Sequence, residues 1–290
     1  MFPKSVLQAA SQLEIRSRLH IASLLAGDYR SSFRGSGMQF KEFRPYEPGD
    51  DIRHINWQVT ARTGKPTVKI YEEERELNVV AVVDASGSTA VGTSRPKFSM
   101  YAEITALLGL GAVRAGDPFG LALFSNRMLA HLPARRSAEH VRQAMESVNE
   151  SARQGQRSDI RPVLGHLRRA LKNRSLVVIL SDFALPAFDV ELRTLATRHE
   201  IVLLQGLDAC EQGQRISGVY RTRDPETGAF GLLDAGSKPA RAQLGAQQTE
   251  LEERLKDLGR GTGADFLRVR TNEDYLGALV RFFHQRSRRA

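Results

Sequence analysis

Two apolar runs that each end in an aspartate constrain the fold of this chain more than any other feature of its sequence. Leu77–Val83 leads directly into Asp84, and Leu176–Ser181 leads into Asp182. Apolar runs of this length are typical of strands that are buried on both faces of a parallel sheet. Because parallel strands need long crossover connections, helices must separate them along the chain. The sequence therefore predicts an α/β protein with a buried, mainly parallel sheet.

Strand-like and helical segments alternate from residue 77 to the C-terminus. Further strands are expected at Phe119–Phe124, Ile201–Gln205 and Asp265–Val269, with edge strands at Leu129–Leu132 and Gly228–Leu233. Helices are expected at Lys97–Ala115, Ala138–Asn149, Ile160–Leu171, Phe188–Arg198, Leu244–Leu258 and Asp274–His284. This alternation predicts a doubly wound sheet of the Rossmann type, and the sequence leaves its strand order open.

The N-terminal part of the chain has a different pattern. Val6–Leu25 places apolar residues at helical spacing and stops before a glycine, as a helix does. In Met38–Glu76, turn signals rich in proline and glycine separate short alternating stretches, which predicts a small β-containing subdomain. We therefore expect two parts: residues 1–76 with the N-terminal helix and this subdomain, and residues 77–290 with the α/β sheet.

Composition excludes several classes of protein. The chain has a single cysteine, Cys210, so neither an intrachain disulfide nor a thiolate zinc cluster can form. No apolar run approaches the roughly 20 residues of a membrane-spanning helix. Charged residues interrupt the N-terminal segment, which therefore does not resemble a signal peptide. The sequence predicts a cytoplasmic protein without a membrane span.

The net charge of +9 allows nucleic acid, anionic lipid or an acidic protein as a partner. The excess of lysine and arginine is spread along the chain, however, and is not interleaved with aromatic residues as on a base-stacking surface. A solvated basic face explains this distribution better than a nucleic-acid site does.

Oxygen-bearing side chains gather where the expected strands end. Asp84, Ser86 and Ser88 follow the first strand of the sheet at alternate positions. Asp182 follows a later strand, and Ser158 lies just ahead of an expected helix. In open parallel sheets, ligands bind at the carboxyl ends of the strands. Carboxylate and hydroxyl oxygens suit Mg²⁺ or Mn²⁺, so the sequence predicts a divalent-metal site made of these residues.

Two alternatives stay open for this cluster. Ser86 and Ser88 could cap the helix that follows, with Asp84 as a strand-end carboxylate whose hydrogen bonds are satisfied. In the third loop, Asp159 competes with Ser158 for the same role, since both side chains carry oxygen.

The small subdomain has acidic residues of its own. Asp50, Asp51 and His54 could ligate a metal. Arginines lie among these acids, which disfavours a bound cation and favours a structural network of ion pairs around Trp57; they are Arg44, Arg53 and Arg62.

The spacing Asp84-x-Ser86-x-Ser88 resembles the metal-ion-dependent adhesion site of von Willebrand factor A domains. On that motif, Asp182 matches the distal aspartate, and Ser158 matches a position that is usually threonine in the family. The resemblance implies a von Willebrand factor A-like fold. It also implies a metal held by Asp84, Ser86, Ser88 and Ser158, with Asp182 acting through water. Such a site accepts a carboxylate from a partner.

Longer motifs are similar to a bacterial family called domain of unknown function 58. They are Gly35-x-Gly37, Phe43-Arg44-x-Tyr46-x-Pro48-Gly49-Asp50-Asp51-x-Arg53-x-Ile55-x-Trp57, Thr60-Ala61-Arg62, Glu73-Glu74-Arg75-Glu76 and Leu180-Ser181-Asp182-Phe183. Members are often encoded beside MoxR-type AAA+ ATPases and are thought to act as their partners or adaptors. The resemblance therefore implies an adaptor that binds such an ATPase, or a client with an acidic residue.

Two other functions compete with this one. A metal-dependent phosphohydrolase could use the same aspartates. Against it, the sequence has no phosphate-binding Gly-x-x-x-x-Gly-Lys-Ser/Thr loop, no Gly-x-Ser-x-Gly elbow and no apparent general base beside the site. A nucleic-acid-binding protein rests on net charge alone. We therefore expect a metal-dependent binding module rather than an enzyme.

Overall fold

The computed structural model describes residues 2–12, 38–73, 77–151, 158–212, 218–223 and 230–289. The chain separates into two compact units, one of Met1–Ile21 with Leu77–Ala290 and one of Ala22–Glu76. No helix in the described ranges is both long and apolar enough to cross a membrane.

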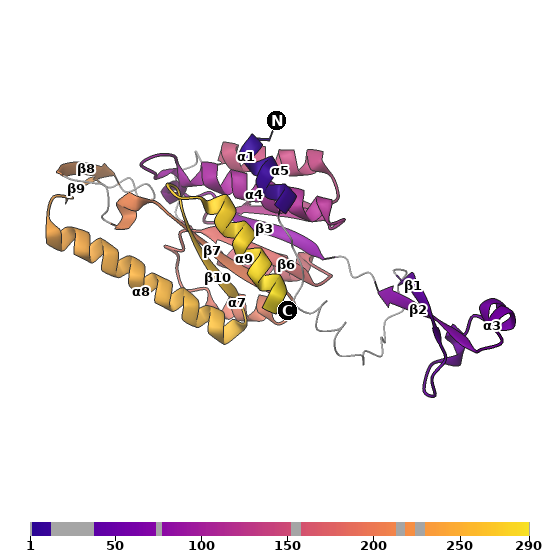
Figure 1. The fold of residues 1–290 in the computed structure, drawn as a ribbon. Helices are drawn as coiled ribbons and strands as arrows, with labels where there is room; N and C mark the ends of the chain where they lie inside the picture. The colour runs from indigo at the N-terminus through magenta and orange to yellow at the C-terminus, as the bar shows by residue number, and fades with distance from the viewer. Residues whose placement is uncertain are drawn as a thin grey trace. The chain divides into compact units, whose positions relative to one another are not determined.

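The larger unit is built on a six-stranded sheet of order β10-β7-β6-β3-β4-β5 (Figure 1). Its strands are β3 (Asn78–Asp84), β4 (Phe119–Phe124), β5 (Met128–Arg135), β6 (Ser175–Ser181), β7 (Glu200–Leu207) and β10 (Asp265–Arg270). Neighbouring strands pair in parallel, except that the edge strand β5 runs antiparallel to β4. The two apolar runs of the sequence form β3 and β6, which lie side by side at the centre. The expected doubly wound, mainly parallel α/β fold is confirmed.

Helices cover both faces of this sheet, because side chains alternate between the faces along each strand. Val79, Ala81 and Val83 of β3 belong to a core with α1 (Lys4–Gln12), α4 (Lys97–Arg114), α5 (Ala138–Ser151) and α9 (Tyr275–Arg289). Val80 and Val82 belong to a second core with α6 (Arg161–Ala170), α7 (Asp189–Ala196) and α8 (Lys238–Thr262). The sheet is therefore buried on both sides, as its apolar strands require.

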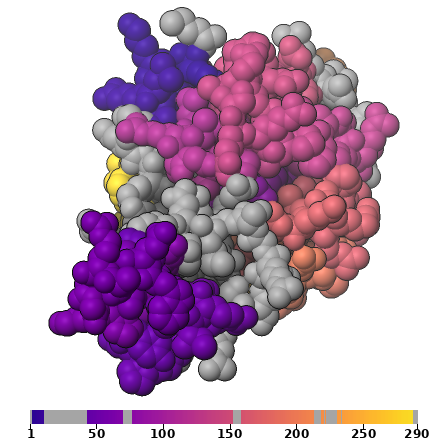
Figure 2. Space-filling view, turned by 90° about the vertical axis from the view of Figure 1, so that its right-hand side faces the viewer, coloured from indigo at the N-terminus to yellow at the C-terminus, as the bar shows by residue number. Residues whose placement is uncertain are grey.

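The N-terminal helix α1 belongs to this larger unit, whereas the sequence grouped it with the residues up to 76. Val6 and Ala10 of α1 are buried in the core. The helix contacts α4 and α9, and Figure 2 shows its indigo side chains against the magenta surface of the larger unit. The remainder of the helix expected over Val6–Leu25 lies outside the described residues.

Two other elements differ from the expectation. The strand expected at Gly228–Leu233 is β9 (Phe230–Asp234), which pairs with β8 (Val219–Arg223) in a separate antiparallel ribbon rather than at the edge of the main sheet. Helix α8 is longer than expected. A proline stands in its first turn, and Gly263 caps its end in the left-handed conformation with φ 73°. Both residues suit those positions in a helix.

The smaller unit pairs β1 (Met38–Pro45) with β2 (Thr67–Glu73) in an antiparallel ribbon, with η1 (Ile52–His54) and α3 (Trp57–Thr63) between them. Asn56 caps α3 by accepting hydrogen bonds from the first N–H groups of the helix. This unit contains the β structure that the turn signals indicate.

Ion pairs form within the smaller unit. Arg44 lies 2.8 Å from Asp50, and Arg53 lies 2.7 Å from Asp51. These pairs agree with the expected structural network, but Trp57 is not at its centre. Trp57 is 69% exposed, and neither η1 nor α3 contains a buried residue.

Candidate functional site

Strands β3 and β6 bring Asp84 and Asp182 to the same edge of the sheet. Val83 pairs with Leu180, so the residues that follow each strand emerge together. Both aspartates are almost completely buried, with 1% of Asp84 and 5% of Asp182 exposed. Their positions follow from the apolar strands before them, because hydrophobic burial fixes where each strand ends.

The Asp84 carboxylate is held by hydrogen bonds from three separate segments of the chain. The backbone N–H of Ser86 donates to its Oδ1 at 2.9 Å. The hydroxyls of Ser158 and Ser181 donate to its Oδ2, at 3.0 and 2.7 Å. All of these donors are uncharged. Ser181 was not among the expected site residues, because the sequence places it inside the strand.

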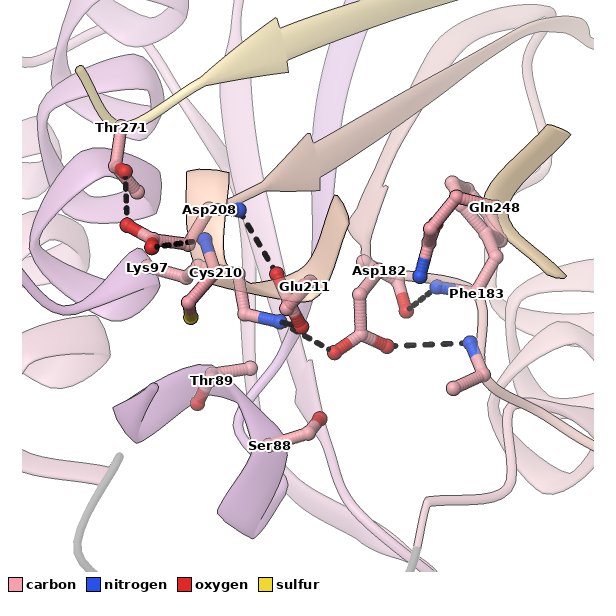
Figure 3. A network of polar contacts seen from close by, with 12 residues as sticks. Ser88, Thr89, Lys97, Asp182, Phe183, Asp208, Cys210, Glu211, Gln248 and Thr271 are labelled. Atoms are coloured by element: carbon pink, nitrogen blue, oxygen red, sulfur yellow. Dashed lines mark hydrogen bonds and ion pairs between the residues drawn. The ribbon is translucent and has the colours of Figure 1, made fainter. Parts of the chain in front are cut away.

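The two serines of the first motif lie next to each other. Their Oγ atoms are 3.0 Å apart, and Ser88 on η2 (Gly87–Ala90) faces Asp182 (Figure 3). Ser86 precedes η2 but makes no side-chain capping hydrogen bond, and the cap of α4 is Pro96. Neither serine therefore caps a helix through its side chain, whereas Asp84 is, as the structural alternative expects, a strand-end carboxylate with satisfied hydrogen bonds.

The third loop presents Ser158 and not Asp159 to the centre of the cluster. Ser158 is buried and contacts Asp84, whereas the Asp159 carboxylate turns to Arg161, at 2.7 Å from its Nη2. The Arg161 guanidinium lowers the pKa of Asp159, although partial burial opposes the shift. The structure thus gathers Asp84, Ser86, Ser88, Ser158 and Asp182 at one edge of the sheet, and leaves Asp159 outside.

Asp84 lacks a cationic partner among the described contacts of this cluster. Burial and the nearby charge of Asp182 raise the pKa of Asp84 to about 6, against the opposing effect of its hydrogen bonds. A cation next to this carboxylate would remove the electrostatic cost of its charge.

Lys97 is a further residue of the site that sequence reasoning missed. It is the first residue of α4 and is 0% exposed, and its Nζ lies 2.8 Å from Oδ2 of Asp182 and 2.5 Å from Oε1 of Glu211 (Figure 3). Burial favours the neutral amine, but the charges of Asp182 and Glu211 outweigh it and raise the pKa of Lys97. Although burial of Asp182 opposes its ionisation, Lys97 lowers the pKa of that carboxyl.

A third aspartate follows the next strand of the sheet. Asp208 comes directly after β7 and accepts hydrogen bonds from the backbone and hydroxyl of Thr93, the N–H of Cys210 and the hydroxyl of Thr271. These donors lower the pKa of Asp208 despite its burial. Its own N–H donates to Glu211 at 2.8 Å. The sequence ended the expected strand at Gln205 and so overlooked Asp208; a buried strand followed by an acid was the available signal.

The lone cysteine has no part in this chemistry. Cys210 is free and half-buried on η3 (Ala209–Gln212), and burial raises the pKa of its thiol to about 12. A thiol that stays protonated at neutral pH is a poor nucleophile and a poor metal ligand.

The donor set fits a small, hard divalent cation. The described residues contain no group of three or more His, Cys, Asp or Glu side chains arranged to hold a metal, so hydroxyls must supply part of any coordination here. Asp84 provides a buried negative charge without a cationic partner, and the serines provide uncharged oxygens beside it. Carboxylate, hydroxyl and water oxygens are the ligands that Mg²⁺ takes in proteins.

Among solved structures, similarity is reported for several proteins. BatB from Bacteroides thetaiotaomicron is 12% identical, with 73% of this chain and 99% of that chain covered and a TM-score of 0.46. The SpRpn10 VWA domain is 10% identical, with 71% and 95% covered and a TM-score of 0.40. Proximal thread matrix protein 1 from the mussel byssus, described with a zinc-occupied MIDAS motif, is 17% identical, with 46% and 38% covered and a TM-score of 0.38.

Sequence comparisons cover more of the chain. Uncharacterized proteins of Mycobacterium bovis and Mycobacterium tuberculosis are 30% identical over 289 residues, which span 97% of this chain and 90% of their own length. The model of the family described as "Protein of unknown function DUF58" matches residues 42–254. This match includes the motif from Phe43 to Trp57 and every residue of the strand-end cluster. The chain therefore belongs to the DUF58 family.

Proposed function

We propose that this protein is a metal-dependent protein-binding module that acts without catalysing a reaction. One observation carries the proposal: Asp84, which has no cationic partner in the described cluster, is surrounded by buried hydroxyls where the central strands end. The residues that would hold Mg²⁺ or Mn²⁺ are Asp84, Ser86, Ser88 and Ser158, with Asp182 acting through water. A bound divalent cation supplies a coordination position at which a carboxylate of a partner protein binds.

The surrounding residues support binding rather than hydrolysis. General acid–base catalysis needs a group that can take up and release a proton near the operating pH. The described hydrogen-bond network of Asp84 and Asp182 contains no histidine. The pKa of Asp84 is raised to about 6, but a bound cation would hold this carboxylate ionised as a ligand. The amine of Lys97 is held charged by two carboxylates, which prevents it from acting as a base.

The partner that we propose is a MoxR-type AAA+ ATPase, with this chain linking the motion of the ATPase to a client. The family resemblance supports this partner, because members are often encoded beside such ATPases. The metal site would bind a carboxylate on the ATPase or on the client. The net charge of +9 would also steer an acidic surface toward the protein in a salt-dependent way.

Metal-dependent association tests this function. The ATPase encoded beside this protein should be captured in Mg²⁺ and released by EDTA, and the double substitution Asp84→Ala with Ser86→Ala should abolish capture. Asp159→Asn is a matched control, since it removes a neighbouring carboxylate that pairs with Arg161 outside the cluster. Capture that is indifferent to EDTA and to the double substitution would show that another surface, such as Met38–Glu76, makes the contact.

A further inference from the structure

We infer that Lys97 is a built-in counter-cation of the metal site: it weakens the hold of the site on a divalent cation and leaves that cation able to accept a carboxylate from a partner. This inference rests on the proposed function. It concerns a residue outside the adhesion-site motif, and it assigns the ammonium group a regulatory effect on both metal and partner affinity.

The ammonium group is fixed in place from two sides. Its contacts to Asp182 and Glu211 join the start of α4 to the segments that follow β6 and β7. Glu211 is itself held by the backbone N–H of Asp208, and Asp208 is anchored to Thr93 and Thr271. Because the Lys97 side chain is itself 0% exposed and held by two carboxylates, its positive charge cannot move into solvent when a cation approaches.

Asp84 and Asp182 differ in how far their negative charges are balanced by neighbouring groups. The charge of Asp182 is largely balanced by Lys97 at 2.8 Å, whereas Asp84 receives hydrogen bonds only from uncharged donors. A divalent cation at the serines would therefore gain the full attraction of Asp84 but a reduced attraction from Asp182. The site would therefore neutralise less of the cation's charge, and the charge that is left unbalanced favours binding of an external carboxylate.

A structural role alone explains Lys97 poorly. A cation in the first turn of a helix faces the positive end of the helix dipole, and Pro96 at the N-cap of α4 has no side-chain acceptor for the first N–H groups. Burial adds a desolvation cost, and replacing buried ion pairs by apolar residues is often neutral or stabilising. The charge at position 97 is therefore better explained by its effect on the neighbouring acidic site.

Titration of the purified full chain with Mn²⁺ in a calorimeter tests the inference. Lys97→Met should tighten Mn²⁺ binding by about tenfold or more, because one charge at this range shifts a neighbouring ionic equilibrium by about one to three powers of ten. Glu211→Gln should weaken Mn²⁺ binding, because it removes a negative charge. The double variant Lys97→Met with Glu211→Gln should bind Mn²⁺ with an affinity close to that of wild type, because the two charge changes cancel. Lys256→Met removes a lysine paired with Glu252 on α8, and should change nothing.

The outcomes separate this inference from the proposed function. If wild type binds Mn²⁺ and neither Lys97→Met nor Glu211→Gln changes the affinity in the stated direction, the counter-cation role is wrong and the metal site stands. If wild type fails to bind but Lys97→Met binds, the inference holds and the proposed function falls. If no folded variant binds, both fall. Should Lys97→Met fail to fold, Glu211→Gln decides alone, and an unchanged affinity overturns the inference.

Discussion

Gly206 in strand β7 marks a point where helix α4 leaves no room for a methyl group. A Cβ atom there would lie 2.5 Å from Cε1 and Oη of Tyr101 and 2.8 Å from its Cζ. Tyr101 is completely buried and lies one helical turn after Lys97, so both side chains project from the same side of α4. Gly206→Ala should therefore push the start of α4 away from the sheet and disturb Lys97 with it.

The expected cost follows from these contacts. Forcing a methyl group into a packed core costs about 1–3 kcal/mol. Alanine recovers about 0.4–1 kcal/mol by restricting the unfolded chain, provided that the native backbone suits it, and Gly206 is not among the described glycines with positive φ. The free energy of unfolding should fall by about 1–2 kcal/mol, and Mn²⁺ affinity should change as α4 moves.

Equilibrium unfolding in urea measures this cost, with two comparisons. Gly165→Ala on α6 is a matched control, because its Cβ would meet nothing within 4 Å, and it should stabilise the helix by about 0.5–1 kcal/mol. In a Tyr101→Leu background, Gly206→Ala should cost much less, because the opposing atoms are gone. If Gly206→Ala is as stable as wild type, or costs the same in both backgrounds, the steric explanation is wrong.

The remaining predictions concern the metal and pH. Mg²⁺ at about 100 times its dissociation constant should raise the free energy of unfolding by about 2.7 kcal/mol; Asp84→Ala should abolish that gain, and equal metal affinity by calorimetry in both proteins would contradict the assignment. Ser158→Ala should weaken Mg²⁺ binding while Ser158→Thr and Asp159→Ala preserve it, and the opposite pattern in the same titration would move the ligand to Asp159. Burial lowers the pKa of His199 to about 4, so the folded state binds fewer protons than the unfolded state, whose histidine titrates near pH 6.5. The contribution of His199 to stability should therefore fall from pH 7 to pH 4, by about 2 kcal/mol once solvent screening is allowed for, while the raised pKa of Asp84 acts in the opposite direction. His199→Phe should lose less stability over this range in urea titrations, and an equal loss would exclude His199 as the cause.

The central strands could be predicted from the sequence because the pattern that indicates them lies in consecutive residues. β3 and β6 are apolar throughout, and an aspartate after each strand must lie at the carboxyl edge of a parallel sheet. The placement of Asp84 and Asp182 could therefore be predicted from residues directly beside them.

The contacts of Lys97 could not be predicted in this way, because the residues that make them come together only in the folded chain. Lys97 contacts Asp182 across 85 positions and Glu211 across 114. In the sequence it resembles any exposed lysine at a helix start. The packing of α1 and the pairing of β9 with β8 also depend on contacts between separate segments, which hydrophobic periodicity does not specify.

The order of the two units along the chain has a mechanical consequence. Ala22–Glu76 is inserted between α1 and β3, both of which belong to the larger unit, so the inserted unit is tethered by two covalent connections. One connection continues as β3, which is hydrogen-bonded on both sides, to β4 and to β6, and ends at Asp84. Tension on this connection would reach the sheet at the start of β3, whose hydrogen bonds to β4 and β6 would share the load. Because β3 ends at Asp84, such a load would be carried by the same strand that positions the proposed metal site.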